Sequence, residues 1–513
     1  GEEWAVGGKS ALELLKEKLA KKELRAVDHG GVEYIPFRKA FYIEPRSIAA
    51  LAPLEVAAIR DSLGIKLRGR GVPKPLETWD QTGLPSRLLQ SLQERQFAAP
   101  FAIQRQALPI IMSGRDVIGI AKTGSGKTLA YLLPMFRQIL DQPPLNDGDG
   151  PIGLILAPAR ELVTQIYHEA RKFAKPLGLR VAAVYGGAQV SEQIADLKRR
   201  AEVVVATPGR LIDILTMNSG RVISLSRVTY VVLDEADRMF DMGFEPQITR
   251  ILNTVRPDRQ TVLFSATFPL HVEMLAKSAL TNPIELVVGG RSTASADVTQ
   301  LVEVHTESEK FPRLLQLLGH WYERGNVLIF VDTKEHCDQL YLDLMKFGYP
   351  AVSLHGGKDQ TERDETIADF KSKVATIMVA TSVAGRGLDV KDLVLVVNYS
   401  CPDHLEDYVH RVGRTGRAGR KGTAYTFITP EEGKYADDLI RALTDAKQSQ
   451  RVTPELAALA AEHHRKVAAG EARKRASGFT RTKGFKFDAT EMSATQASRD
   501  AHRRAYELQA GIK

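Results

Sequence analysis

Short apolar runs that do not alternate with polar residues recur along two long stretches of this chain, separated by amphipathic stretches. A strand with one solvent-exposed face alternates apolar and polar residues, so uninterrupted runs predict strands covered on both faces, as in a parallel sheet of βα repeats. The first stretch contains the predicted strands Val117–Ile120, Gly153–Leu156, Val181–Val184, Val203–Ala206, Tyr230–Leu233 and Thr261–Phe264. The second contains Val327–Val331, Val352–Leu354, Thr376–Ala380, Leu393–Val397 and Ala424–Ile428. The sequence therefore predicts an α/β fold with two tandem domains, each holding a parallel sheet.

Changes in composition set the predicted domain boundaries within the 513 residues. We expect an N-terminal extension (1–75), a first domain (76–288), a linker (289–297), a second domain (298–447) and a C-terminal extension (448–513). The small residues from Gly289 to Ser295 are typical of a hinge, so the two domains are expected to move relative to each other.

Segments of the two extensions carry recognisable patterns. Leucines at helical spacing predict a helix over 11–25, and a second helix is expected near Pro454–Lys466. The Gly, Arg, Lys and Pro residues of Gly64–Pro75 predict an extended linker, and Ser477–Asp488 is also expected to be extended. The aromatic segment Tyr34–Tyr42 is expected either to dock a protein or to fold back on the first domain.

Positive charge gathers at the two ends of the chain. Residues 1–75 hold 14 basic and 10 acidic side chains, residues 451–513 hold 13 basic and 7 acidic ones, and the net charge of the whole chain is +8. The part between them is therefore nearly neutral. Basic ends are typical of arms that meet a polyanion, but they also keep a protein soluble, so charge alone leaves both interpretations open.

Several classes of protein are excluded by simpler features. Having only two cysteines, Cys337 and Cys401, excludes a disulfide scaffold and a cysteine-built zinc site, and free thiols fit a reducing compartment. No apolar run approaches the roughly 18 residues that a membrane helix needs, so no membrane association is expected. The chain begins at Gly1 without Met or a secretory segment, and we expect a truncated intracellular chain.

A glycine-rich loop follows the first predicted strand and precedes a predicted helix that begins near Leu129. It reads AKTGSGKT from Ala121 to Thr128. Glycines in such a loop let backbone N–H groups surround phosphate oxygens, while the lysine reaches the β- and γ-phosphates. The residues expected to bind the nucleotide are Thr123, Gly124, Ser125, Gly126, Lys127 and Thr128, and the Thr128 hydroxyl is expected to join the shell of a Mg²⁺ ion.

An acidic cluster follows the predicted strand Tyr230–Leu233. Asp234 is placed to hold Mg²⁺, and Glu235 is placed to polarise an attacking water. Acidic residues after a strand are more often only a helix cap. Because a phosphate loop lies upstream in the same α/β unit, the catalytic interpretation is favoured, and the chain is predicted to hydrolyse a nucleoside triphosphate.

The segment Asp234-Glu235-Ala236-Asp237 resembles the signature of the DEAD-box RNA helicases, and further segments resemble that family's motifs in the same order. They are Gly186-Gly187, Thr207 to Arg210, Ser265 to Thr267, Phe330 to Thr333, His355 to Gly357, Thr381 to Asp389 and His410 to Arg417. The resemblance covers about residues 79–430. It implies two RecA-like domains that hydrolyse ATP with Mg²⁺, are stimulated by RNA, and close around both substrates.

The resemblance also assigns residues to the nucleotide. Phe97 and Gln104 are expected to select adenine, although this chain has Phe101 where the family usually has Thr. Gly387 and Asp389 are expected near the ribose or the attacking water. Lys127, Asp234 and Glu235 are expected to carry out the chemistry on the first domain.

The second domain is expected to complete this site. Arg414 and Arg417 resemble the arginine fingers of the family, which stabilise charge in the transition state. His410 resembles the residue that links the ATP site to the segment holding Ser265 and Thr267, so those two are assigned to coupling between ATP and RNA.

Small hydroxyl residues, glycines and arginines suit contacts to phosphates and 2′-OH groups, which carry little base information. The resemblance implies RNA contacts at Arg160, Gly187, Thr207, Gly209, Arg210, Thr333, Gly357, Arg363 and Thr381. The chain departs from the family at Ala159, where Thr is usual, and at Ser382, where Asp is commoner.

Both ends extend the resemblance to one branch of the family, the splicing ATPases of prespliceosome assembly. The segments that carry it are Ala26–Gly30, Glu33-Tyr34, Pro36–Lys39, Gly69–Pro75, Ser477–Phe479 and Gly484–Phe487, together with Ser113–Asp116 and Val397–Pro402 between the ends. It implies a nuclear protein, by family default a monomer, that remodels U2 snRNA or pre-mRNA together with U2 snRNP proteins at the branch site. The alternative is a nucleotide-gated RNA clamp or assembly factor in another nuclear process such as ribosome biogenesis, and the residues alone do not separate the two.

Overall fold

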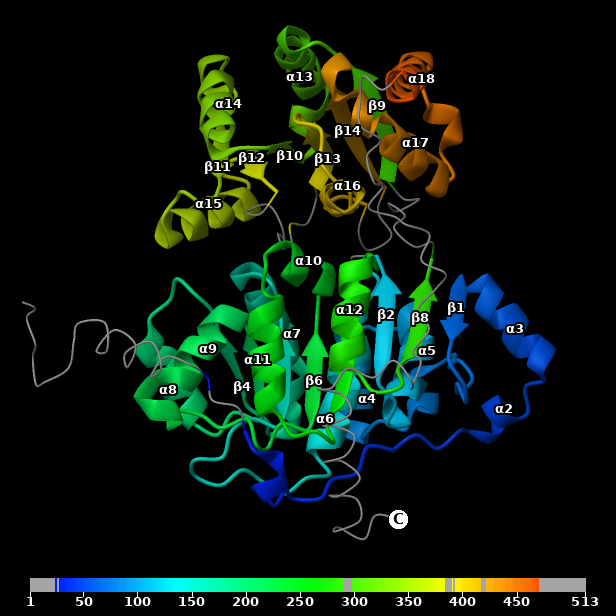
Figure 1. Ribbon diagram of the computed structural model, residues 1–513, viewed down its shortest axis with the longest axis vertical. Coiled ribbons are helices and arrows are strands. Elements are labelled where there is room, and N and C mark those ends of the chain that lie inside the picture. Colours follow the sequence, from blue (N-terminus) through cyan, green and yellow to red (C-terminus); the bar gives the residue numbers. More distant parts are fainter. Residues whose placement is uncertain are drawn as a thin grey trace, which may run out of the picture.

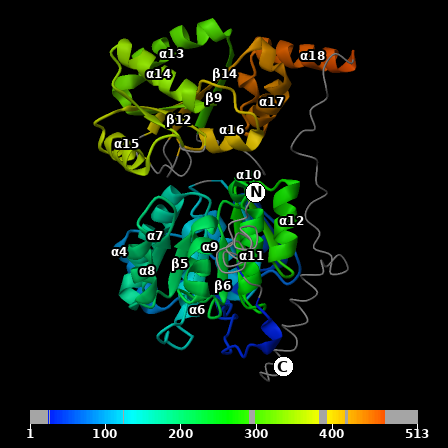
Figure 2. The ribbon, with the colours of Figure 1, turned by 60° about the vertical axis from the view of Figure 1, so that its left-hand side comes forward.

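The computed structural model describes residues 24, 27–122, 124–289, 298–382, 390, 393–416 and 421–469. They form two α/β domains, with the second domain above the first in Figure 1, and the same stacking is seen after rotation in Figure 2. The predicted fold class is confirmed. Apart from Leu24, the helix expected over 11–25 lies outside the described residues, as do the hinge residues 290–295 and the stretch Ser477–Asp488.

The sheet of the first domain has eight strands in the order β1-β8-β2-β7-β6-β3-β5-β4. They are β1 (Ile65–Arg68), β2 (Val117–Ala121), β3 (Gly153–Leu156), β4 (Val181–Val184), β5 (Val203–Ala206), β6 (Tyr230–Leu233), β7 (Gln260–Ser265) and β8 (Ile284–Val288). Every pairing is parallel except that of β1 with β8 at the edge.

The expected extended linker over Gly64–Pro75 is wrong for residues 65–68, which form β1. Ile65 and Leu67 alternate with Lys66 and Arg68, and Ile65 is buried while Lys66 is exposed. Alternation of this kind is typical of an edge strand with one wet face. The neighbouring β8 is also absent from the predicted strands, and Glu285 interrupts its apolar run.

Helices cover both faces of this sheet. One face carries α4 (Ser86–Glu94), α5 (Ala102–Met112), α6 (Lys127–Ile139) and α7 (Arg160–Ala174), and the other carries α8 (Val190–Lys198), α9 (Pro208–Thr216), α10 (Ala236–Asp241), α11 (Glu245–Thr254) and α12 (Leu270–Ala279). Along β2, Val117 and Ala121 join the first core and Ile118 and Ile120 join the second. Burial on both faces explains the uninterrupted apolar runs.

The N-terminal segment wraps the side of the first domain that faces away from the second domain, as the dark blue chain in Figure 1 shows. The guanidinium carbon of Arg256 lies 4.7 Å from the ring centre of Tyr34 and 4.8 Å from that of Phe37. Phe41 also donates its backbone N–H to Met112 O at 2.6 Å. Of the two alternatives for Tyr34–Tyr42, the structure has the one in which the segment folds back. The short helices α2 (Arg46–Ala49) and α3 (Pro53–Ser62) then lead to β1.

The second domain holds a parallel six-stranded sheet in the order β11-β12-β10-β13-β14-β9. Its strands are β9 (Val298–Val304), β10 (Asn326–Val331), β11 (Ala351–Leu354), β12 (Ile377–Thr381), β13 (Leu393–Asn398) and β14 (Gly422–Ile428). All but β9 match predicted strands to within two residues.

Helices α13 (Glu307–Trp321) and α14 (Lys334–Lys346) cover one face of that sheet. The other face carries α15 (Gln360–Ser372), α16 (Leu405–Val412), α17 (Ala436–Asp445) and α18 (Pro454–Ala468). The helix expected near Pro454–Lys466 is therefore confirmed, and it packs on the core through Leu456 and Leu459. Among the described residues, no helix has the length and apolar character that crossing a membrane requires.

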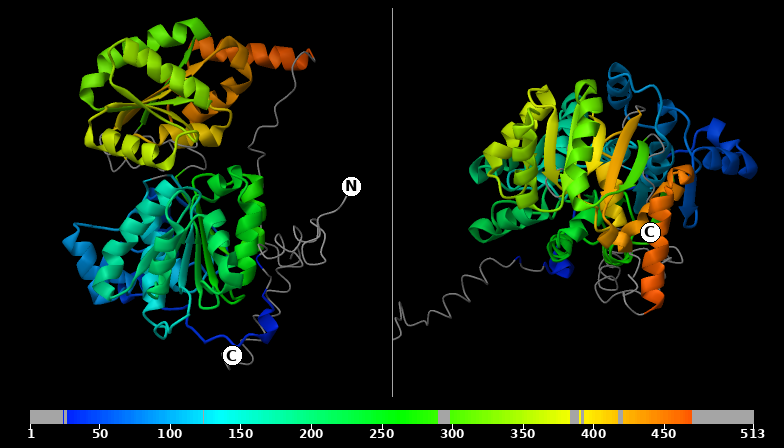
Figure 3. Two further views of the ribbon diagram at one scale, coloured as in Figure 1. Left: turned by 90° about the vertical axis from the view of Figure 1, so that its left-hand side faces the viewer. Right: turned by 90° about the horizontal axis from the view of Figure 1, so that it is seen from above.

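The carboxyl ends of the strands in the first domain point toward the second domain, as the arrows of β2 and β6 show in Figure 1. In α/β sheets, ligands bind at this end. Helix α10 on the first domain lies opposite α16 on the second, and the left-hand view of Figure 3 shows the same stacking from the side. Contacts such as that of Asp237 with His410 join the two domains here. The candidate site is therefore formed where the domains meet.

Candidate nucleotide and RNA site between the two domains

The phosphate loop joins β2 to α6, as predicted. Gly126 precedes the first residue of α6 and has φ 90°, a left-handed conformation that favours glycine. Free N–H groups at a helix start attract phosphate. Ser125 Oγ is buried and has no hydrogen-bond partner within the described part of the chain, so the loop has an unused polar group where a phosphate oxygen fits. Thr123 lies outside the described residues.

The acidic cluster lies beside this loop. Asp234 follows β6, and its Oδ2 accepts a hydrogen bond from Tyr131 Oη at 2.9 Å. Burial raises the pKa of Asp234 to about 6, and the Glu235 charge adds to the rise while the Lys127 ammonium opposes it. Asp234 and Thr128 offer the oxygen ligands that Mg²⁺ prefers, and Mg²⁺ commonly takes only one or two protein ligands. The donor set therefore fits the predicted metal.

Glu235 has an unusual backbone. Its φ is 51° and its ψ is 52°, so it is left-handed at the residue before α10. A non-glycine residue in this region costs about 1–3 kcal/mol, and such strain gathers at functional sites. The side chain is buried in the structure. This strained turn places Glu235 directly after Asp234, the expected metal ligand.

A cavity of about 800 Å³ extends from the phosphate loop along α7 to α15 of the second domain. Phe97 and Gln104 line it, as expected for an adenine site. The Gln104 carboxamide is already engaged, because Oε1 accepts from Phe101 N at 2.8 Å and Nε2 donates to Gly126 O at 2.9 Å. Its second N–H and lone pair remain for a base.

Sequence reasoning gave no role to Tyr131 or Asp237, and it noted Phe101 only as a departure from the family's usual Thr. Phe101 lines the cavity beside Gly126 and is 53% exposed. Tyr131 comes one helical turn after Lys127, so the spacing alone places both on one face of α6. Asp237 belongs to the signature that revealed Asp234 and Glu235, but the pattern gave it no role.

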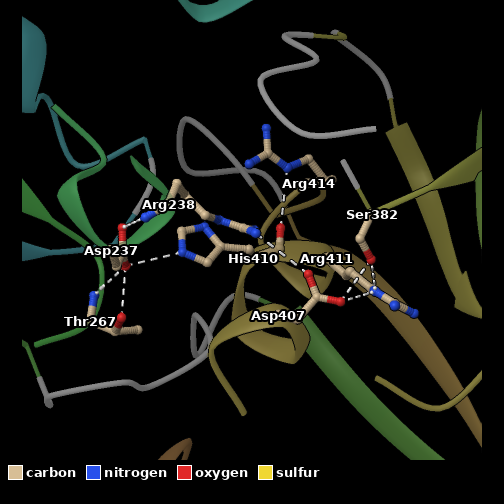
Figure 4. Close-up of polar contacts among 8 residues, drawn as sticks. All are labelled: Asp237, Arg238, Thr267, Ser382, Asp407, His410, Arg411 and Arg414. Carbon is tan, nitrogen blue, oxygen red and sulfur yellow. Dashed lines mark hydrogen bonds and ion pairs between the residues drawn. The ribbon is translucent and has the colours of Figure 1, made fainter. Parts of the chain in front are cut away.

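Asp237 joins the two domains. Its Oδ2 accepts hydrogen bonds from Thr267 Oγ1 at 2.7 Å and Thr267 N at 3.0 Å, and it lies 3.2 Å from His410 Nε2 (Figure 4). Ser265 Oγ accepts from Asp237 N at 3.3 Å. The structure thus brings Ser265, Thr267 and His410 together through Asp237.

The charges in this link are fixed by their surroundings. Burial alone would raise the pKa of Asp237, but His410, Arg238 and Thr267 hold it well below its usual range. Burial and the Arg238 charge lower the pKa of His410. We therefore assign a neutral imidazole that donates through Nε2 to an ionised Asp237.

Arg414, one of the two predicted fingers, lies just after the end of α16. Arg414 Nε donates to His410 O at 3.1 Å (Figure 4), so the position of the Arg414 side chain follows that of the helix. Arg417, and with it Gly387 and Asp389 of the predicted nucleotide site, lies outside the described residues.

The predicted RNA residues gather at the carboxyl ends of neighbouring strands. In the first domain, Arg160, Gly187 and Thr207 follow β3, β4 and β5, which are adjacent in the sheet. Gly209 lies in α9, and Arg210 of that helix donates to Ala188 O at 3.2 Å, beside Gly187. In the second domain, Thr333, Gly357 and Thr381 lie at or just after the ends of β10, β11 and β12, again adjacent.

Two ion pairs cross between these groups. Arg160 Nη2 lies 2.5 Å from Asp364 Oδ2, and Arg363 Nη2 lies 2.8 Å from Glu161 Oε1. Each pair joins an arginine of one domain to a carboxylate of the other. Arg160 and Arg363, two of the three arginines expected to bind RNA, are therefore held by acidic side chains of the other domain in this arrangement.

Comparison with known proteins identifies the family of the chain. The DEAD/DEAH box helicase family model matches residues 101–275, and the model for the helicase conserved C-terminal domain matches residues 309–419. The chain is 58% identical over 470 residues to DEAD-box ATP-dependent RNA helicase 42 of Oryza sativa, covering 92% of this chain and 44% of that protein. It is 56% identical over 473 residues to pre-mRNA-processing ATP-dependent RNA helicase PRP5 of Mycosarcoma maydis, covering 91% of this chain and 41% of that protein. The chain thus spans less than half the length of these relatives.

A solved structure agrees with the fold. The structure of Dbp5 from S. cerevisiae, bound to RNA and ADP BeF3, superposes with a TM-score of 0.63 at 30% sequence identity. The match covers 72% of this chain and 94% of that chain. The motifs, the two parallel-sheet domains and these relatives agree, and the chain belongs to the DEAD-box helicase family.

Proposed function

We propose that this chain is an RNA-stimulated ATPase that uses ATP and Mg²⁺ to remodel RNA or ribonucleoprotein during pre-mRNA splicing. The observation that carries the proposal is the link from Thr267 through Asp237 to His410, which connects the first domain's nucleotide site to the second domain. RNA contacts predicted on both domains can then control hydrolysis by bringing the domains together.

Different residues have different roles in ATP hydrolysis. Bound ATP and Mg²⁺ supply the phosphoryl group and the charge that neutralises it in the transition state. Lys127 and the α6 start hold the phosphates, Asp234 and Thr128 hold the metal, and Glu235 orients and deprotonates the attacking water. Arg414, together with Arg417, brings positive charge from the second domain to the developing transition state.

Catalysis therefore depends on domain closure. His410 donates to Asp237 only while α16 lies against α10, and Asp237 in turn orders Thr267. RNA that spans the carboxyl ends of both sheets stabilises this closed arrangement. It also competes with Asp364 and Glu161 for the two arginines of the crossing ion pairs.

Hydrolysis of ATP, measured with and without single-stranded RNA, tests the biochemical part. The parent chain should be stimulated by RNA, and Arg414→Ala should lower turnover far more than ATP affinity, because its charge counts mainly in the transition state. Equal losses of turnover and affinity would make Arg414 a binding residue. A parent chain that hydrolyses ATP equally with and without RNA would contradict the proposed coupling.

The splicing role rests on the relatives and on the ends of the chain. One relative is named a pre-mRNA-processing helicase, and its match covers 91% of this chain. We infer that the protein is nuclear, acts as a monomer, and works with U2 snRNP proteins at the branch site. Nuclear extract depleted of the protein should fail to form the complex of U2 snRNP with the branch site until the protein and ATP are restored. If this complex formed normally without the protein, a role on another nuclear RNA would be favoured.

A further inference from the structure

Arg238, the residue after Asp237, carries a buried charge that its surroundings compensate only in part. Its side chain is 1% exposed. Among the described residues, Nε, Nη1 and Nη2 make no hydrogen bond. Its ion-pair partner is Asp407, whose Oδ1 lies 3.5 Å from Nη1 in the second domain. A buried guanidinium is costly unless it is paired, so the first domain relies on a carboxylate that the second domain supplies.

Asp407 is held rigidly for this contact. Its Oδ2 accepts hydrogen bonds from Arg411 Nε at 2.6 Å and from Ser382 Oγ at 2.7 Å (Figure 4). Burial alone would raise the pKa of Asp407, but the charges of Arg411 and Arg238 lower it. Asp407 therefore remains ionised. Ser382, where the family more often has Asp, lets one carboxylate serve both arginines without a second negative charge beside it.

Two neighbouring contacts join the domains, and the acidic residue belongs to the first domain in one and to the second domain in the other. Adjacent residues of the first domain, Asp237 and Arg238, meet His410 and Asp407, which lie three residues apart on α16. Residues with this spacing share one face of a helix. If α16 slipped by one turn toward its carboxyl end, Asp407 would approach Asp237, and like charges disfavour that arrangement. The pair of contacts thus permits one register.

We propose that Arg238 is a positioning residue, which by pairing with Asp407 sets the register of α16 against α10 and so places His410 and Arg414 at the nucleotide. The inference rests on the proposed function, because it concerns the same hydrolysis. Arg238 acts through Asp407, and the effect reaches Arg414 because that side chain is bonded to the end of α16.

Arg238 also influences a titratable group. His410 faces Asp237, Arg238 and Glu235 from the first domain and lies one turn from Asp407 on its own helix. Burial and then the Arg238 charge lower the pKa of His410, while the two acidic groups raise it. Removing Arg238 should therefore raise the pKa of His410, and turnover that needs neutral His410 should be lost at a higher pH.

The test compares Arg238→Met with the parent chain at saturating ATP and RNA. Turnover should fall about ten- to hundredfold, as expected for misplaced catalytic groups. Binding of a fluorescent ATP analogue without RNA should change less than about twofold, which also shows that the variant is folded. The acidic limb of the pH–turnover profile should move to higher pH. Arg238→Lys should restore part of the turnover, and it should bring the pH–turnover profile back closer still to that of the parent chain.

Arg227→Met is a matched control. Arg227 is also buried and pairs with Asp149 at 2.8 Å, but within the first domain and before β6, at the opposite end of that strand from Arg238. The Arg227→Met variant should retain the turnover and the pH–turnover profile of the parent chain. Asp407→Asn should reproduce the loss of Arg238→Met, and the double variant should lose less than the product of the two single losses.

The outcomes separate the two hypotheses. A parent chain with no RNA-stimulated turnover rejects the proposed function and this inference with it. If the parent is active but Arg238→Met retains its turnover and pH profile, only the inference is rejected. Independent, multiplicative losses for Arg238→Met and Asp407→Asn also reject it, because the two residues would then not act as a pair.

Discussion

The ammonium group of Lys127 lies 3.0 Å from the carbonyl oxygen of Ala121, so its side chain closes the phosphate loop onto the end of β2. Lys127 is 7% exposed in this position. A triphosphate must take this charge from a neutral carbonyl, and it offers a stronger, charged acceptor in exchange. The lysine is therefore ordered near its site of action.

Lys127→Ala should weaken ATP binding about ten- to hundredfold, because a hydrogen bond to a charged group contributes about 1.5–3 kcal/mol. Titration with a fluorescent ATP analogue measures this. Lys122→Ala is the control, since Lys122 lies in the same loop but is exposed. Equal losses for both variants would show that only the overall charge of the loop matters.

Glu235→Gln should bind ATP and RNA with nearly parent affinity but hydrolyse ATP at least about a hundredfold more slowly, because the amide cannot accept the proton of the attacking water. The variant should accumulate in the closed, RNA-bound state. Single-turnover hydrolysis and RNA retention in a pull-down measure the two effects. Hydrolysis at the parent rate would remove Glu235 from its role as the base.

Nucleotide binding should require a higher Mg²⁺ concentration at acidic pH. The pKa of Asp234 is raised to about 6, chiefly by burial, and only the carboxylate binds the metal. Below about pH 6, the Mg²⁺ concentration for half-maximal binding should rise about tenfold per pH unit. Titrations at pH 5.5 and 7.5 measure the change, and Asp234→Asn should abolish the dependence.

The same raised pKa has a consequence for the metal-free chain. Between the ordinary value of 3.8 and about 6, the folded chain holds a proton on Asp234 that the unfolded chain has released. The free energy of unfolding should therefore decrease as the pH rises through this window, by an amount on the order of 3 kcal/mol from this group. Urea unfolding of the parent and Asp234→Asn at pH 4.5 and 6.5 gives the contribution by difference. A difference that is independent of pH would contradict it.

Freeing Arg160 should strengthen RNA binding. Asp364 is 49% exposed on its side chain, and partly exposed pairs of this kind contribute about 0.2–1 kcal/mol. Asp364→Asn should therefore raise RNA affinity in the absence of ATP by about 1.4- to fivefold, with the larger effect at low salt. Fluorescence anisotropy measures it. Asp343→Asn, on α14 and paired with Lys346, is the control. A fall in affinity would mean that Asp364 does not compete with RNA.

The buried pair of Arg256 with Asp258, which the N-terminal segment covers, should contribute to the stability of the first domain. Arg256 is 1% exposed and makes two hydrogen bonds to Asp258, at 2.6 and 2.8 Å, between the rings of Tyr34 and Phe37. Asp258→Ala removes the carboxylate partner of this buried guanidinium, which should cost about 3–5 kcal/mol. Urea unfolding measures the loss, and RNA-stimulated turnover of the folded fraction should be retained. A decrease in the free energy of unfolding below about 1 kcal/mol would contradict a stabilising role of this buried pair.

Strands buried on both faces were the part of the fold most readily predicted. β3, β5 and β6 are buried along their whole length, and they match their predicted limits because no polar residue interrupts them. β1 and β9 were missed for the opposite reason, since each lies at a sheet edge and alternates buried and more exposed residues. A rule tuned to continuous apolar runs does not detect such strands.

The candidate site shows a similar division. Lys127, Asp234 and Glu235 could be proposed from the sequence because each stands in a short local pattern that follows a predicted strand. Arg238 and Asp407 could not, because their pairing joins positions far apart in the sequence and depends on how α10 and α16 meet. The aromatic segment Tyr34–Tyr42 left two alternatives for the same reason, as its partner Arg256 lies far along the chain.

The antiparallel pairing of β1 with β8 affects where the protein can be divided. β8 is the strand just before the linker, and Gly289 N bonds to Gly64 O at its end. A fragment that starts near Trp79, where the recognisable motifs begin, would leave the backbone of β8 open along one side. Open edges recruit strands from other molecules, whereas the exposed Lys66 and Arg68 of β1 discourage this. A soluble preparation of the first domain should therefore start before Gly64, even though the catalytic residues lie well downstream.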